Sequence, residues 1–398
     1  MNTHHPAIRH GLWRDASFSA IVAGMVTVVV GFTSSAALVF EVARSLGATD
    51  QQIGSWIWAL SFGIGTTCIV LSLQYRMPVV AAWSTPGAAM LITSVAGVPL
   101  SDAIGAFMVS ALLFVLCGFS GLFERAVTRI PVSITSGMLG GVLLRFGLDA
   151  FSVLQVQSGM VLAMFATYLA ACRLVPRYAV LLAMLAGIGV SAMLGLTRNE
   201  GFSLALATPT WVTPTFSIAA VLGIALPLFV VTMTSQNLAG AAVIRAAGYP
   251  LPLSPVIGWT GVANLLLAPF GAFALNLAAI SAAISMGPEA HPDPAKRYVA
   301  AVATGAIYLV VGLFGATVAS LFALLPTELV MAIAGFALLG TISNSLTLAM
   351  RDESEREAAL VSFLLTASGV VILGIGSALW GLAAGLLVLA TRRRGNAG

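Results

Sequence analysis

Two short polar runs interrupt stretches of sequence that are otherwise almost entirely apolar. The run TSQN at residues 234–237 comes two residues after VLGIALPLFVV, and the run TSSA at residues 33–36 follows VTVVVGF. Hydroxyl and amide side chains donate and accept hydrogen bonds without carrying a charge. In an apolar setting such groups need partners, and they often bind a ligand. The two runs therefore predict a set of binding residues: Thr33, Ser34, Ser35, Gln236 and Asn237.

Two further segments predict helices that begin inside an apolar stretch. In RMPVVAAWSTPGAAMLITSVAGVP (76–99), Ser84 or Thr85 suits the N-cap of a helix, and Pro86 suits its first helical position. The preceding PVVAAW favours an extended backbone. The second segment, APFGAFALNLAAISAAISMG (268–287), aligns at an offset of 191 and places Asn276 on Thr85 as a second N-cap.

The start of a helix offers unpaired backbone N–H groups and partial positive charge, which favour an anion such as a carboxylate. Trp83, Phe270 and Phe273 lie beside the two expected helix starts, where they would sandwich a flat apolar ring, and Gly87 lies in the first turn. The competing interpretation is two capped kinks that pack against their neighbours without a ligand.

Composition places these segments in a bilayer. Of the 398 residues, 59% are hydrophobic and 8% charged, with a mean hydropathy of +1.02, whereas soluble domains carry about 25% charged residues. Apolar runs near the roughly 20 residues that cross a membrane as a helix recur along the chain. We expect an all-α integral membrane protein with fourteen spans, at about 17–43, 53–73, 78–98, 101–123, 131–147, 156–172, 178–196, 215–241, 254–267, 269–287, 297–322, 326–349, 357–375 and 377–391.

The distribution of Lys and Arg predicts the orientation. With a cytoplasmic N-terminus, fifteen of the 18 Lys and Arg residues fall on the cytoplasmic side, and only Arg44, Arg145 and Arg198 fall outside. This excess is what the positive-inside rule describes. We expect both termini in the cytoplasm and a location in the cell inner (cytoplasmic) membrane.

The halves of the chain repeat each other. Residues 29–48 match 230–249 at an offset of 201, and residues 115–144 match 310–339 at an offset of 195. Chance is the alternative for either match alone, but two matches in the same order argue against it. The halves 1–200 and 201–398 each hold seven expected spans, an odd number, so the second half is inverted. Inverted repeats with a substrate site near the midplane are typical of secondary transporters.

Among the titratable residues, one is a candidate for proton coupling, and the positions of the cysteines and histidines argue against a metal site. Glu41 lies six residues after Ser35, roughly 9 Å along a helix, and is the best candidate for proton coupling; a plain position at the membrane surface is the competing interpretation. The three cysteines are isolated and the four histidines lie in polar segments, so we expect no metal and no cofactor.

Together, GFTSSAALVFEVA, WSTPGAAML, RIPVSITSGMLGGVLL and TSQNLAGAA resemble the benzoate/proton symporter family along essentially the whole chain. That family is similar in plan to the nucleobase and sulfate/bicarbonate transporters. The resemblance implies seven plus seven spans, with broken spans 3 and 10, a core domain (about 17–123 plus 215–322) and a gate domain (about 131–196 plus 326–391). It also implies that the substrate binds between spans 3 and 10, and that the core moves against the gate.

One residue departs from the pattern of the nucleobase transporters. Where these carry a substrate-binding glutamate in span 8, this chain has Gln236. An amide donates hydrogen bonds to a carboxylate, which an ionised glutamate does not. The departure favours an aromatic acid over uracil or xanthine.

We therefore expect a transporter that imports benzoate or a related small aromatic carboxylate with a proton. A nucleobase or inorganic-anion transporter of the same fold is the nearest alternative, and an anion channel is another. An enzyme is the least favoured class because no paired acids, Ser/His pair or metal ligands lie in the spans. The expected partners are the substrate, the proton and the bilayer, with no nucleic acid. The oligomeric state stays open, a homodimer included.

Overall fold

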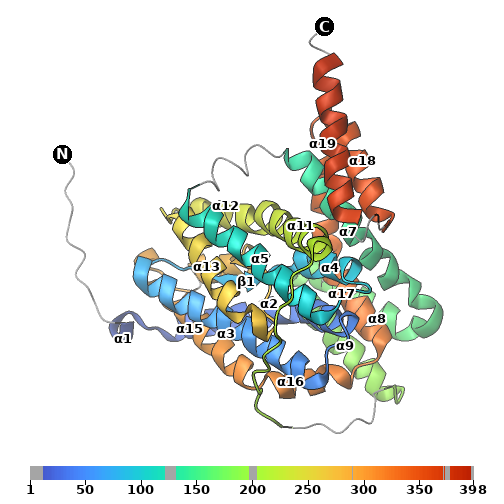
Figure 1. The fold of residues 1–398 in the computed structure, drawn as a ribbon. Coiled ribbons are helices and arrows are strands. Elements are labelled where there is room, and N and C mark those ends of the chain that lie inside the picture. The colour runs from blue at the N-terminus through green and yellow to red at the C-terminus, as the bar shows by residue number, and fades with distance from the viewer. Residues whose placement is uncertain are drawn as a thin grey trace, which may run out of the picture.

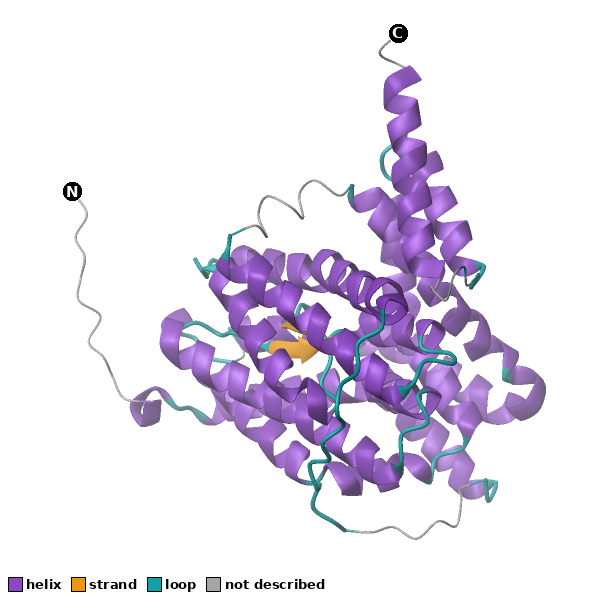
Figure 2. Cartoon of the chain, viewed as in Figure 1, coloured by secondary structure: helices purple, strands orange, loops and turns teal. Residues whose placement is uncertain are grey.

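The structure is a computed structural model that describes residues 12–121, 131–196, 204–288, 290–370, 372 and 377–395. The described chain is largely helical, with one small β-ribbon near its centre (Figures 1 and 2).

The elements of the first half are α1 (Leu12–Asp15), α2 (Phe18–Ser45), α3 (Asp50–Tyr75), β1 (Ala81–Trp83), α4 (Thr85–Ser94), α5 (Leu100–Phe119), α7 (Val132–Ser152), α8 (Leu154–Leu174), the 3-10 turn η2 (Pro176–Tyr178) and α9 (Ala179–Met193).

In the second half, one helical stretch runs through α10 (Ile218–Ala220), the π-helical η3 (Val221–Ala225), α11 (Leu226–Val231), the π-helical η4 (Thr232–Asn237) and α12 (Leu238–Ala246). The remaining elements are α13 (Leu253–Leu267), the 3-10 turn η5 (Ala268–Phe270), β2 (Leu275–Leu277), α14 (Ile280–Met286), the 3-10 turn η6 (Pro294–Lys296), α15 (Tyr298–Leu313), α16 (Gly315–Ala323), α17 (Thr327–Ala349), α18 (Arg356–Ala367) and α19 (Ser377–Gly395).

By length and composition, eight helices of the described chain are able to cross a membrane, or nine if the bent α2 counts as one span. The fourteen expected spans exceed this number because several of them are short or broken. The third and tenth expected spans are each a strand followed by a short helix, and the expected span 297–322 is broken at Phe314 into α15 and α16.

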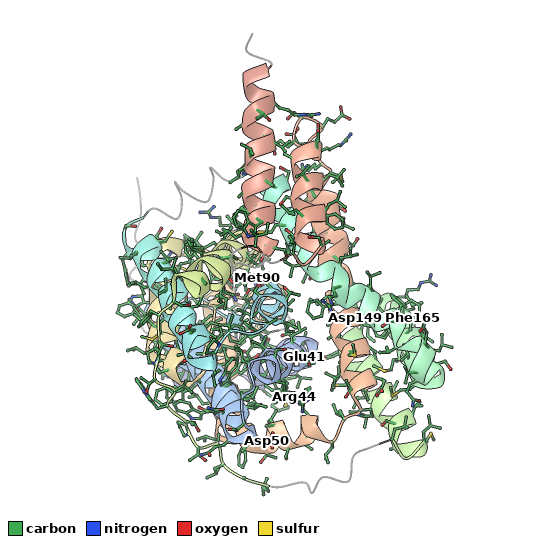
Figure 3. The ribbon with its side chains drawn as sticks, turned by 45° about the vertical axis from the view of Figure 1, so that its right-hand side comes forward. Glu41, Arg44, Asp50, Met90, Asp149 and Phe165 are labelled. Atoms are coloured by element: carbon green, nitrogen blue, oxygen red, sulfur yellow. The ribbon has the colours of Figure 1, made fainter. Side chains whose placement is uncertain are left out.

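The helices fall into two groups that Figure 3 separates. The larger helix group, residues 18–119 and 218–323, is built from α2 against α15, α3 against α15 and α16, and α5 against α13. The smaller helix group, residues 132–193 and 327–395, is built from α7 against α17 and α18, α18 against α19, and α8 against α9. Contacts of α2 with α17 and of α4 with α7 join the two groups.

Several local features repeat between the halves, as the sequence predicts. Pro131 and Pro326, matched at the offset of 195, are the N-cap residues of α7 and α17. The polar runs, matched at the offset of 201, both interrupt regular helix: α2 bends by 43° between Phe32 and Ser35, and η4 is π-helical over 232–237. Short polar side chains compete for backbone hydrogen bonds, which explains why both interruptions fall there.

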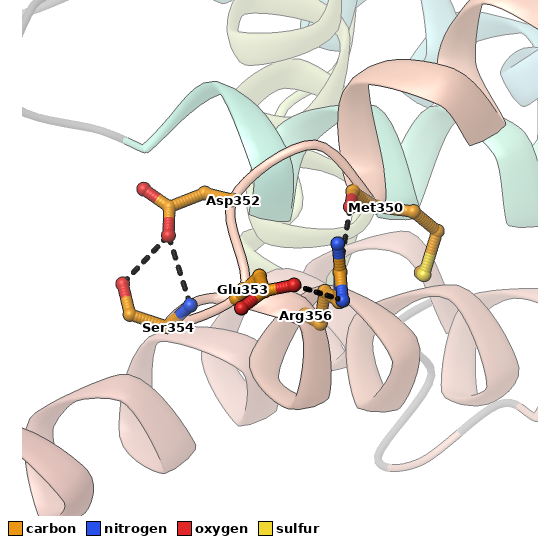
Figure 4. A network of polar contacts seen from close by, with 5 residues as sticks. All are labelled: Met350, Asp352, Glu353, Ser354 and Arg356. Carbon is orange, nitrogen blue, oxygen red and sulfur yellow. Dashed lines mark hydrogen bonds and ion pairs between the residues drawn. The ribbon is translucent and has the colours of Figure 1, made fainter.

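A polar loop joins α17 to α18 outside the apolar helices (Figure 4). The hydroxyl and the backbone N–H of Ser354 both donate to Asp352, and they lower the pKa of its carboxyl group below the usual value. Arg356 donates to the carbonyl of Met350 and pairs with Glu353 at 3.0 Å. The loop is thus held by its own side chains.

Candidate functional site

The centre of the site is the ribbon in which β1 and β2 pair in antiparallel fashion. The partners are Ala81 with Leu277, Ala82 with Asn276, and Trp83 with Leu275. Further bonds extend the ladder, from the Ser84 N–H to the Ala274 carbonyl at 3.1 Å and from the Ala278 N–H to the Val80 carbonyl at 2.9 Å. The extended backbone expected in both broken segments is therefore present, and it is satisfied inside the protein as a bilayer requires.

Helix α3 holds the approach to β1. The Cys68 thiol accepts a hydrogen bond from the Ala81 N–H at 3.2 Å, and the Ser72 hydroxyl bonds both the N–H and the carbonyl of Val79 at 3.0 and 3.1 Å. Cys68 is therefore a packing residue with a backbone partner, and it is fully buried.

The first broken span begins its helix where the sequence predicts. Ser84 is the N-cap of α4, and its hydroxyl accepts from the Gly87 N–H at 3.0 Å. Pro86 lies at the second helical position instead of the first and has no N–H to offer. In this first turn, the Gly87 N–H is bonded to the cap and Pro86 has no N–H. The Thr85 N–H is the donor that has no partner among the described residues.

The expected second N-cap is wrong. Asn276 lies at the middle of β2, fully buried, and α14 begins only at Ile280, after Ala279 and without a side-chain cap. Pairing with β1 keeps residues 275–277 extended, so the helix starts later than local preference suggests. The ribbon places Ala82 opposite Asn276, which gives an offset of 194 where the sequence alignment used 191.

Asn276 is nevertheless unusual for a buried residue. Its amide group donates to the carbonyl of Ala274 at 3.0 Å, but its side-chain oxygen has no hydrogen-bond partner among the described residues. Ala274 itself has a φ of 45°, a left-handed conformation that residues other than glycine seldom adopt. A buried acceptor without a donor is costly, and it suits a ligand or water that offers a proton.

Trp83 projects from β1 into a polar and aromatic setting. Its indole N–H donates to the Ser35 hydroxyl at 2.8 Å, and both residues are buried. Phe32 and Tyr308 pack edge-on against the indole, with ring centroids 5.5 and 6.3 Å away. The first polar run and the first broken span therefore meet at this hydrogen bond.

The residues of the second polar run differ in their hydrogen-bond partners. Thr234 and Ser235 donate to backbone carbonyls one turn earlier, at 2.8 and 2.6 Å. The buried Asn237 accepts from the Leu277 N–H at 3.0 Å and so continues the edge of the ribbon. Gln236 is half-buried and makes no hydrogen bond within the described chain, although η4 packs against α4, β2 and α7. Its amide is the free polar group of this run.

The expected aromatic sandwich does not form. Phe270 packs on Trp58 and Trp211, with centroids 5.7 and 5.4 Å away, and the fully buried Phe273 packs on Trp56 and Phe107. Neither ring contacts Trp83, because Gly271 and the turn before β2 direct them to the side of α3 and α5. Phe32 and Tyr308, which the sequence analysis did not single out, take their place beside Trp83.

With this geometry established, comparison with known proteins assigns the family. A family model described as benzoate membrane transport protein matches residues 14–391. The chain belongs to this family. It is 47% identical over 365 residues to the inner membrane protein YdcO of Escherichia coli, covering 92% of this chain and 93% of that protein. It is 37% identical over 376 residues to the benzoate membrane transport protein of Acinetobacter baylyi, covering 94% and 95%.

Solved structures show the fold. The chain matches SLC26A9 with a TM-score of 0.64 and 13% identity, covering 94% of this chain and 65% of that one. It matches the transmembrane domain of the cyanobacterial bicarbonate transporter BicA with a TM-score of 0.54 and 17% identity, covering 96% and 97%. The chain thus belongs to a family of membrane transporters, not of enzymes. Its largely helical fold is similar to the fold of these solved proteins.

Thr33, Ser34 and Gly87 complete the set of expected binding residues in this member of the benzoate transport family. The side chains of Thr33 and Ser34 lie outside the described part of the structure, although their backbone lies in α2. Gly87 lies in the first turn of α4 in tight contact: a Cβ there would approach Leu228 and Ser84 to 2.8 Å. Gly87 therefore allows α4 to approach α11 closely.

Glu41 lies apart from the buried residues. It is exposed near the end of α2, together with Arg44, and Figure 3 shows both on the larger helix group, with Asp149 on the smaller one. Phe40, the residue before it, is buried and stacks on Phe322 with centroids 4.3 Å apart. A role for Glu41 in coupling would require its carboxylate to act through solvent or through movement of α2.

Proposed function

We propose that this member of the benzoate membrane transport protein family carries benzoate, or a related small aromatic carboxylate, across the inner membrane together with a proton. The family match, the name of the relative from Acinetobacter baylyi and the name of the inner-membrane relative from Escherichia coli support the substrate and the location. The coupling to protons and the exact acid are the parts of the proposal that need measurement.

The proposed architecture is fourteen crossings in a seven-plus-seven inverted repeat, with both termini in the cytoplasm. The repeat is supported by the matched caps of α7 and α17, the matched interruptions of α2 and η4, and the antiparallel ribbon. We assign the larger helix group to a core domain (about 17–123 plus 215–322) and the smaller to a gate domain (about 131–196 plus 326–391). Transport then follows from movement of the core against the gate, with different affinities for substrate in the two states.

The observation that carries the proposal is the convergence of α2, β1, α4 and η4. The aromatic ring of the substrate would pack against the Trp83 indole, which is fixed by Ser35 and buried in this structure. The Thr85 N–H at the start of α4 and the free amide of Gln236 offer donors for a carboxylate. No carboxylate side chain lies on β1, α4, β2 or η4 to repel an anion.

The proton has two routes in this proposal. It loads on Glu41, or it enters as part of the neutral carboxylic acid. The second route gives the buried Asn276 oxygen a donor, since the acid hydroxyl would supply the hydrogen bond that this acceptor lacks. If Glu41 carries the proton, Glu41→Gln should abolish the response of uptake to a proton gradient. If the proton enters with the neutral acid, the response should remain in this variant.

Proteoliposome uptake tests the function directly. Labelled benzoate should accumulate when an inward proton gradient is applied, and unlabelled salicylate should compete for the site, whereas uracil and sulfate should not. Benzoate uptake that ignores the gradient would refute proton coupling. Competition by sulfate or uracil would favour an inorganic-anion or nucleobase transporter, and flux that neither saturates nor accumulates would favour a channel.

A further inference from the structure

A groove lies between α3 and α13, on the outer surface of the larger helix group. Its volume is about 490 Å³, and its walls include Phe62, Val70 and Gln74 on α3 and Trp259, Ala263 and Leu266 on α13. These residues do not belong to the site around the ribbon. Leu266 is 68% exposed and Val70 is 57% exposed, an exposure that would be costly in water. We propose that this groove binds one acyl chain of a membrane phospholipid.

The surroundings of the groove support a lipid occupant. Both walls are helices that are long and apolar enough to cross a membrane, so the groove opens toward hydrocarbon. The polar lining residues are Thr66 and Thr67 on α3 and, toward one end of the groove, Gln74, which is exposed in the last turn of α3. Trp259, at the start of the α13 wall, packs edge-on against Phe119. Tryptophan and polar side chains at that level are typical of the headgroup boundary.

The volume of the groove distinguishes between an acyl chain and a helix as its occupant. A chain that contacts its neighbours at about 4.5 Å and runs through half of a roughly 30 Å hydrocarbon layer occupies roughly 240 Å³. Two turns of a helix about 10 Å across occupy roughly 850 Å³. The groove, at about 490 Å³, therefore has room for an acyl chain but does not enclose two turns of a helix from a second copy.

The groove also lies directly behind the ribbon. Leu267 of its wall and Leu275 of β2 both reach into the space that Gly63 leaves open, where a Cβ would approach them to 3.0 and 2.5 Å. On α3, the groove residue Leu71 lies next to Ser72, which holds the approach to β1. A chain in the groove would thus support the outer side of the layer that carries both strands.

Native mass spectrometry of the full chain tests the proposal, with palmitoyl-oleoyl phosphatidylglycerol as the probe. Ala263→Trp fills the groove from α13, Thr66→Phe fills it from α3, and Ala306→Trp is the matched control on an exposed face of α15. Wild type and the control should retain one phospholipid per chain. Both groove variants should retain it at least about tenfold less well, because losing the burial of two methylenes already weakens binding by about that factor.

Two results would overturn the proposal. Groove variants that keep as much phospholipid as Ala306→Trp would show that the lipid binds elsewhere. A wild-type dimer without phospholipid, converted to monomer by both groove variants, would identify a second copy of the chain as the occupant. The use of one variant from each wall keeps the test valid if either of them fails to fold.

Discussion

Replacing Gln236 with alanine is the sharpest test of the proposed binding site. The amide is half-buried and has no hydrogen-bond partner within the described chain, so the empty protein should lose little on its removal. We expect the free energy of unfolding to change by no more than about 0.5 kcal/mol. A hydrogen bond from this amide to a carboxylate is worth about 1.5–3 kcal/mol, which corresponds to a roughly 10- to 150-fold loss of benzoate affinity.

Ser235 provides the matched control in the same π-helical segment. Its hydroxyl already donates to the Val231 carbonyl at 2.6 Å, so Ser235→Ala should change benzoate affinity by less than about threefold, since a local side-chain bond of this kind contributes little. The assay is binding of labelled benzoate to purified protein by scintillation proximity, alongside a thermal unfolding midpoint for each variant. Equal affinities in wild type, Gln236→Ala and Ser235→Ala would refute the assignment of Gln236 to the substrate.

Two further predictions concern the stability of the ribbon and its helix. Ser84→Ala removes the cap of the Gly87 N–H and should lower the free energy of unfolding by about 1 kcal/mol, measured by thermal or denaturant unfolding in detergent; an unchanged midpoint would show that water replaces the cap. Asn237→Leu should destabilise by about 1–3 kcal/mol, because the Leu277 N–H loses its acceptor inside the membrane. The same change at Asn264, whose buried amide has no partner in the described part of the chain, should be neutral or stabilising, and equal losses at both positions would contradict the reasoning.

Sequence patterns predict what is decided within a few residues. Ser84 is recognisable as a cap because it precedes proline and an apolar helical run, and Pro131 and Pro326 mark helix starts for similar reasons. The two polar runs are matched by the sequence repeat, and both coincide with interruptions of regular helix that the span assignment did not include. The family resemblance, carried by four short motifs, is confirmed over residues 14–391.

Local sequence patterns do not predict the features that depend on contacts between the two halves of the chain. Asn276 is a good N-cap by local preference, but its pairing with Ala82 places it in a strand. Phe270 and Phe273 lie close to the second broken span in sequence, yet the turn before β2 directs both rings away from Trp83. Phe32 and Tyr308 carry no sequence signal, since each is one aromatic among many in an apolar helix.

The pairing of Ala82 with Asn276 also sets an order of events during synthesis. About 190 residues separate the two strands, so β1 enters the bilayer long before its partner exists. Until residue 277 has been made, the backbone groups of β1 that face β2 lack their partners, and such groups are costly in hydrocarbon. Contacts of such long range form late. The first half of the chain therefore does not constitute half of a working transporter: the proposed binding site comes into being only when the second half inserts and supplies β2.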